Sequence, residues 1–128
     1  MFVSTRNNQT FQIWIMQANG ANPTLLTNPT TASDTYFHLS PDGSRIAFES
    51  NRIGGSNIEL YVMNLDGSGF AQVTPNADYA GSFDWSPDGT KLVFMNSYDI
   101  NIINVDGSGE ANLTNSPNVI DDSPIFQP

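Results

Sequence analysis

The sequence has 128 residues, no cysteine and a net charge of −9, because 13 acidic side chains face only 4 basic ones. Four basic side chains are too few to form a broad phosphate-binding face, and we therefore expect no nucleic-acid partner. The lack of cysteine excludes disulfides and thiolate chemistry, and the apolar runs are too short to span a membrane.

The chain begins inside a strand, because Phe2-Val3-Ser4-Thr5-Arg6 matches Phe48-Glu49-Ser50-Asn51-Arg52 further along. Two more strands are expected at 11–17 and 25–27, where apolar and polar residues partly alternate. This first unit, about 1–33, therefore lacks the strand that should precede Phe2. Residues 1–4 have neither a basic head nor a long apolar stretch, so they do not form a secretory signal.

The second unit, about 34–77, is complete and contains the tetrapeptide Ser40-Pro41-Asp42-Gly43. Proline fixes φ at the first corner of a tight turn, aspartate bonds to the nearby backbone, and glycine takes a positive φ. An apolar strand follows at 45–48, and further strands are expected at 60–65 and 72–74. The pattern predicts a four-stranded antiparallel sheet.

The third unit, about 78–118, repeats this order, and its tetrapeptide Ser86-Pro87-Asp88-Gly89 comes 46 residues after the first one. Its strands are expected at 91–94 and 100–105, with the intervening turn near Asn96-Ser97-Tyr98. Four-stranded units of about 40–45 residues are typical of β-propeller blades. The fold class is therefore all-β, a propeller with three blades in this chain.

The tail, about 119–128, aligns with residues 81–87 through Phe126 on Trp85 and Pro128 on Pro87. It reads as one more first strand with no later strands. Three blades cannot close a ring, since propellers have about 4–8. We therefore expect a six-bladed homodimer in which each tail completes the partner's first blade. The residues expected to close the dimer are Phe2, Val3, Ser4, Ile125 and Phe126.

These repeats resemble those of TolB-type β-propellers, a WD40-like family built around Ser-Pro-Asp-Gly. The resemblance rests on residues 83–94, 60–67 and 73–74, although Phe37 and Phe83 replace the proline of the family pattern. It implies a non-catalytic binding or scaffold module for protein–protein interaction and an extracytoplasmic location. The alternatives are a propeller-type hydrolase and a fragment of a larger TolB-like or peptidase-associated propeller protein.

Polar residues on or just before the inner strands are the candidate ligand site at the mouth of the central channel. They are Asp34, Tyr36, His38, Asp78, Ser82, Asp84, Asp121 and Asp122. Clustered carboxylates attract Ca²⁺ or basic groups of a protein or peptide partner, and the alternative is a hydrated polar rim. His38 and the channel carboxylates would serve the hydrolase alternative, but no Gly-x-Ser-x-Gly or His-Glu-x-x-His motif occurs. We expect no required cofactor.

Overall fold

The protein is described by a computed structural model that covers residues 1–6, 9–27, 31–54, 57–75, 77 and 79–127. The described strands form three separate antiparallel sheets. The first contains β1 (Phe2–Ser4), β2 (Gln12–Ile15) and β3 (Thr24–Leu25). The second contains β4 (Asp34–Leu39), β5 (Arg45–Ser50), β6 (Glu59–Asn64) and β7 (Ala71–Gln72). The third contains β8 (Ala80–Trp85), β9 (Lys91–Asn96), β10 (Asp99–Asn104) and β11 (Ala111–Asn112).

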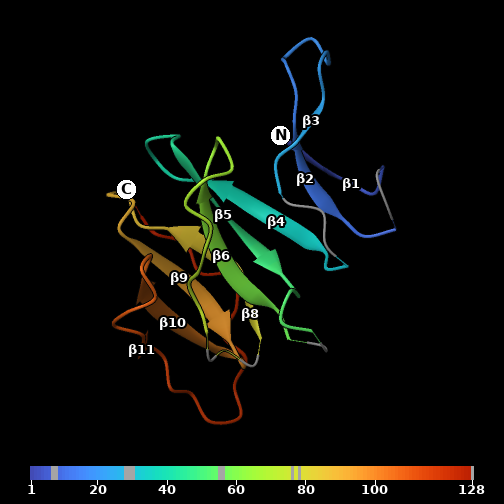
Figure 1. The fold of residues 1–128 in the computed structure, drawn as a ribbon. Coiled ribbons are helices and arrows are strands. Elements are labelled where there is room, and N and C mark those ends of the chain that lie inside the picture. The colour runs from blue at the N-terminus through green and yellow to red at the C-terminus, as the bar shows by residue number, and fades with distance from the viewer. Residues whose placement is uncertain (7–8, 28–30, 55–56, 76, 78, 128) are drawn as a thin grey trace.

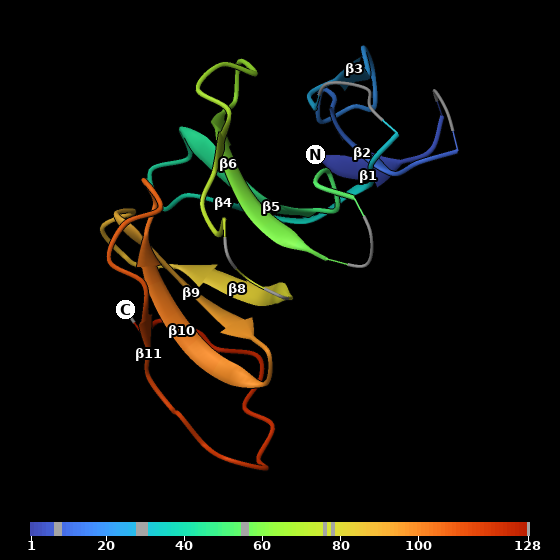
Figure 2. The ribbon, with the colours of Figure 1, turned by 60° about the horizontal axis from the view of Figure 1, so that its bottom comes forward.

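The three sheets follow one another around an arc, like blades of a fan (Figures 1 and 2). We call them blades 1, 2 and 3. The four-stranded blades pair their strands in sequence order, and β4 and β8 form their inner edges. In blade 1, β1 forms one edge of the sheet, and no described strand takes the inner position beside it that β4 and β8 hold in the other blades. None of the described residues forms a helix that could cross a membrane.

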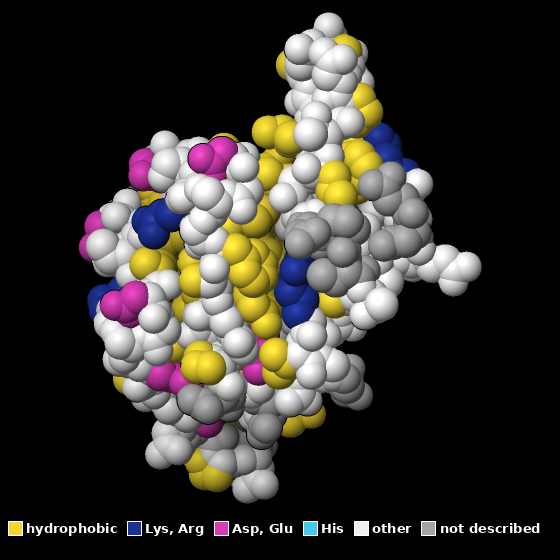
Figure 3. Space-filling model, in the orientation of Figure 1, with side chains coloured by type: hydrophobic (Ala, Val, Ile, Leu, Met, Phe, Trp, Pro, Cys, Tyr) yellow, Lys and Arg dark blue, Asp and Glu magenta, His cyan; other side chains and the backbone are white. Residues whose placement is uncertain are grey.

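Both faces of blade 2 are buried, because each packs against a neighbouring blade. Alternate residues of a strand point to opposite sides of a sheet, so neighbouring residues of β5 enter different cores. Ile46 and Phe48 of β5 join Ile13 in the core between blades 1 and 2. Ala47 between them joins Phe83 and the rest of the core between blades 2 and 3. Figure 3 shows a band of hydrophobic side chains that reaches the surface over β5 and β6. The cores between the blades hold the arc together.

The predicted tight turns form as expected. The amide of Gly43 donates to the Ser40 carbonyl at 2.8 Å, and Gly43 has a φ of 70°. The hydroxyl of Ser40 donates to the Asp42 carboxylate at 2.6 Å. Hydrogen bonds from Ser40 and Ser44 lower the pKa of Asp42 to about 2. The third-blade turn lies where predicted, with positive φ at both Ser97 and Tyr98.

Candidate functional site

Two matching β-bulges shape the inner edge of the arc. The pairing of β4 with β5 shifts between Thr35 and Phe37, and that of β8 with β9 shifts between Gly81 and Phe83. The extra residues are Tyr36, with a φ of 34°, and Ser82, with a φ of 42°. A bulge redirects the side chain it carries, and positive φ in a residue other than glycine is a strained conformation often found at functional sites.

Both bulge residues open into one pocket of about 390 Å³ on the inner side of blades 2 and 3. Its lining comes from β4, β5, the segment before β8, β8 itself and the C-terminal tail. The lining residues are Tyr36, His38, Glu49, Tyr79, Ser82, Phe83, Ser123, Pro124 and Ile125. The structure thus brings together Tyr36, His38 and Ser82 from the predicted mouth.

Glu49 is the candidate site residue that the sequence alone did not indicate. Its side chain is 5% exposed and accepts a hydrogen bond from the Ser82 amide at 3.3 Å. Burial raises the pKa of Glu49 to about 7, although the Ser82 hydrogen bond acts in the opposite direction. None of the described lysine and arginine side chains pairs with it. The available signal was a charged residue at the strand position that Val3 and Met95 hold in the other copies.

The pocket is electronegative. Burial, together with the nearby carboxylates of Glu49 and Asp122, raises the pKa of the Tyr79 phenol. His38 is half-exposed, with its Nδ1 atom 3.8 Å from Asp84 Oδ1 and its ring packed on Phe83. A bound cationic group would find carboxylates close by and aromatic faces suited to cation–π contact.

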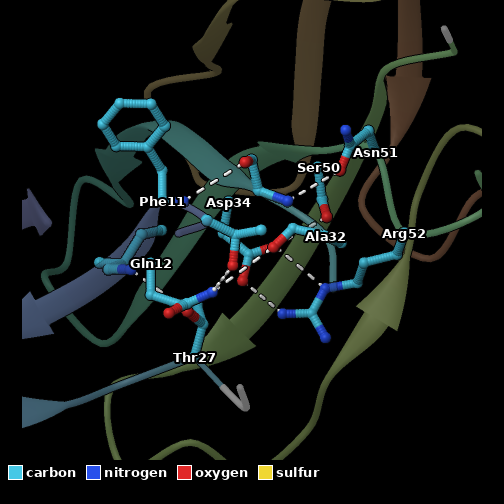
Figure 4. A network of polar contacts seen from close by, with 11 residues as sticks. Phe11, Gln12, Thr27, Ala32, Asp34, Ser50, Asn51 and Arg52 are labelled. Carbon is cyan, nitrogen blue, oxygen red and sulfur yellow. Dashed lines mark hydrogen bonds and ion pairs between the residues drawn. The ribbon is translucent and has the colours of Figure 1, made fainter. Parts of the chain in front are cut away.

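Asp34 does not lie on an exposed rim, as the sequence had suggested. It is fully buried and forms an ion pair with Arg52, at 3.0 Å to Nε and 2.5 Å to Nη2. The hydroxyl of Ser50 donates to the same carboxylate at 2.7 Å. Figure 4 shows Arg52 and Ser50 both pointing at Asp34. The carboxylate is therefore engaged in a structural network instead of facing a ligand.

The other predicted carboxylates are spread out. Asp84 accepts a hydrogen bond from the Phe126 amide at 3.0 Å, which ties the tail to β8. Asp122 is exposed, Asp121 lies against blade 3, and Asp78 lies outside the described residues. No three His, Asp or Glu residues in the described part of the chain are grouped closely enough to hold a metal ion. The described residues thus provide no such group for the Ca²⁺ ion that the sequence allows at the channel mouth.

The tail continues the arc beyond blade 3. The amide of Asp121 donates to the Tyr98 carbonyl at 2.8 Å, as Ala80 does to Ile58 at 2.7 Å. Ser123 aligns with the bulge residue Ser82, has a φ of 57°, and lines the same pocket. Residues 121–127 therefore sit where the inner strand of a next blade would run, but they pair with no second strand.

The alignment assigns different sides to the last two apolar residues. Phe126 matches Trp85, which is 4% exposed in the core between blades 2 and 3. Ile125 matches Asp84 on the channel side, and it is 77% exposed. The alignment therefore gives the position that faces a core between blades to Phe126 alone, and Phe126 is half-buried in the single chain.

The residues expected to close a dimer on the other side lie in β1. Phe2 pairs with Trp14, Val3 with Ile13 and Ser4 with Gln12. Phe2 and Ser4 are half-buried, whereas their counterparts in β5, Phe48 and Ser50, are buried. Phe2 and Ser4 are more exposed because no described strand lies beside β1 in the position that β4 takes beside β5.

Solved structures with the same arrangement come from several proteins. A putative TolB from Agrobacterium tumefaciens is 24% identical with a TM-score of 0.68, over 81% of this chain and 41% of that one. TolB from Acinetobacter baumannii is 19% identical with a TM-score of 0.65, over 88% of this chain and 28% of that one. Oligogalacturonate lyase from Vibrio parahaemolyticus is 20% identical with a TM-score of 0.58, over 78% of this chain and 28% of that one.

The chain thus spans less than half the length of these three proteins. At these identities the likeness shows the fold alone. No curated protein matches the chain. The family of the TolB beta propeller domain, in contrast, matches residues 1–128. With three propeller blades in the structure and this match along the whole sequence, the chain belongs to the TolB β-propeller domain family.

Proposed function

We propose that the chain is a non-catalytic binding module, half of a six-bladed ring that two copies close, and that it binds a basic segment of another protein. The observation that carries the binding role is the pocket in which Tyr36, Ser82 and Ser123 stand at equivalent positions beside buried Glu49. The TolB-family fold supports a scaffold role of this kind. The net charge of −9 favours a cationic partner over an anionic one.

Ring closure is supported by what the two ends of the arc lack. No described strand pairs with the inner edge of β1, and unpaired edges readily accept a further strand. Residues 121–127 follow the path of an inner strand and have no second strand beside them. In a two-fold dimer each end would supply what the other lacks, and the two seams would be identical.

The binding role can be tested by selecting peptides from a random display library on the purified chain. We expect enrichment of peptides rich in lysine or arginine. Glu49→Gln and Tyr36→Ala should abolish their binding, whereas Glu110→Gln, an exposed acidic residue outside the pocket, should leave it unchanged. Peptides that bind all four proteins equally, or no enrichment at all, would contradict the binding role of this pocket.

An enzyme is the second candidate, and Glu49 is the observation that favours it. A carboxyl group whose pKa is near 7 beside a histidine is suited to general acid–base catalysis. One similar solved structure is an oligogalacturonate lyase from Vibrio parahaemolyticus, and another is an oligogalacturonate lyase in complex with manganese. A panel of glycosides, esters and oligogalacturonate with Mn²⁺ tests this candidate. Turnover that both Glu49→Gln and His38→Ala remove would replace the binding proposal.

A further inference from the structure

The buried network around Asp34 provides a template for how an inner strand is locked to the next strand. Asp34 begins β4, Ser50 ends β5, and Arg52 follows two residues later. The Asp34 carboxylate accepts hydrogen bonds from the Ser50 hydroxyl and from two nitrogens of Arg52 (Figure 4). The charges of Asp34 and Arg52 are thus paired inside blade 2.

The same three residue types occur at the two ends of the chain. Ser4 ends β1 and Arg6 follows two residues later, as Arg52 follows Ser50. Asp121 takes the place of Asp34 in the tail. Its amide donates to the Tyr98 carbonyl at 2.8 Å, and the Asp34 amide donates to the Phe11 carbonyl at 2.8 Å. The correspondence is therefore one of backbone geometry as well as of sequence.

Each half of this second set lacks its partner in the single chain. The Asp121 Oδ2 atom is buried and has no hydrogen-bond partner in the structure. Arg6 is exposed and pairs with no carboxylate of the described residues. Its Nε atom instead donates to Ser4 Oγ at 3.3 Å. A buried carboxylate oxygen without a partner is costly, so this arrangement favours an incoming cation.

Within the described residues of one copy, the two halves do not meet. Blade 1 and the tail lie at opposite ends of the arc, with blades 2 and 3 between them (Figure 2). Asp34 stands opposite Ser50 in the register of β4 and β5. Transferred to the ends, this register places Asp121 opposite Ser4, with Arg6 within reach of the carboxylate. In a ring of two copies, the carboxylate then comes from the other copy.

We propose that Ser4 and Arg6 of one copy bind the Asp121 carboxylate of a second copy, as Ser50 and Arg52 bind Asp34. The proposal rests on the ring closure proposed above and names the charged pair that sets its register. A bidentate arginine–carboxylate pair is geometrically specific. The inner edge of β1 thus recognises residues 121–127 of a second copy by charge as well as by backbone pairing.

A charge-swap experiment tests this pair with the whole chain. Arg6→Asp and Asp121→Arg each place like charges at both seams of a homodimer. Each should raise the dimer dissociation constant at least about thirtyfold, as measured by sedimentation. When the two variants are mixed, one seam carries the native pair and the other the reversed pair. We therefore expect the mixture to form a 1:1 heterodimer with most of the lost affinity restored.

The controls separate failure of the pair from failure of the ring. Glu110→Arg makes the same charge change as Asp121→Arg at an exposed site and should dimerise like the parent chain. If the parent dimerises and both swaps dimerise equally well, the pair is wrong although the ring stands. If the parent chain is a monomer, the ring closure itself fails. Folded variants whose mixture stays monomeric would also overturn the pair, with circular dichroism confirming that each is folded.

Discussion

Arg52 and Asp34 meet through two contacts, at 3.0 Å and 2.5 Å, and the Asp34 side chain is fully buried. The pair joins the start of the inner strand β4 to the end of β5. Because β4 also contacts blade 1, the pair holds the inner edge of blade 2 in place at the junction of the two blades. It is the only ion pair between a basic and an acidic side chain, histidine apart, among the described residues.

Arg52→Ala should lower the free energy of unfolding by about 3 kcal/mol, because it leaves Asp34 buried without a counter-charge. Urea denaturation at fixed protein concentration measures the change. The double variant Arg52→Ala with Asp34→Asn removes both charges and should be less destabilised than Arg52→Ala alone. If the double variant were the less stable of the two, Asp34 would not depend on Arg52 for compensation.

Glu49 should make stability fall as the pH rises from about 4.5 to 7. Its pKa is raised from 4.5 to about 7 in the folded chain, so the folded state holds the proton more tightly than the unfolded state does. The resulting stabilisation is complete below the unfolded pKa and is lost as the pH passes the folded one. Thermal unfolding of Glu49→Gln should show a flatter profile over this range. An unchanged profile would show that Glu49 titrates normally.

Asp42 and Asp88 should act in the opposite direction and at lower pH. Hydrogen bonds from neighbouring serine and threonine residues lower the pKa of both turn carboxylates from 3.8 to about 2. Their stabilisation is therefore present above pH 3.8 and is lost as the pH falls toward 2. Asp42→Asn with Asp88→Asn should reduce this acid-induced loss and leave the profile above pH 4.5 unaltered. Acid unfolding followed by fluorescence provides the comparison.

Two equivalent turn glycines provide a matched test of packing between blades. Gly20 and Gly107 both have a φ of 84°, where an added Cβ atom costs about 1–2 kcal/mol. A Cβ at Gly20 would meet nothing within 4 Å, but at Gly107 it would lie 3.2 Å from the Val73 carbonyl oxygen of the neighbouring blade. Gly107→Ala should therefore be more destabilising than Gly20→Ala in urea denaturation. Equal losses would show that the blades have room to separate at this turn.

Phe126 and Ile125 separate the two sides of the proposed exchanged strand. Phe126 matches buried Trp85, and Ile125 matches Asp84 on the channel side. Phe126→Ala should weaken dimerisation by about 3–5 kcal/mol, the range for deleting a buried aromatic side chain. Ile125→Ser should have little effect in the same sedimentation assay. The reverse order would mean that the tail docks with the opposite face inward.

The repeats allowed much of the fold to be predicted. The four residues Ser-Pro-Asp-Gly are enough to predict a tight turn, and the positive φ of Gly43 confirms that turn. The bulges at Tyr36 and Ser82 could not be predicted, because neither tyrosine nor serine indicates a positive φ. Nor could the pairing of Asp34 with Arg52, since it depends on the register of two strands. The repeats show that Glu49 is the charged residue at a position that Val3 and Met95 hold elsewhere, but its burial depends on the packing of β5 against blade 3.

The mass of the 128-residue chain in solution tests the central claim most directly. Sedimentation equilibrium, over concentrations from nanomolar to micromolar, should give a species of twice the 13.9 kDa chain mass. The same chain without residues 121–128 should give the monomer mass or fail to fold. A 128-residue chain that remains a compact, stable 13.9 kDa monomer would contradict the closed ring. A truncated chain that still forms a well-folded dimer would contradict closure by the tail.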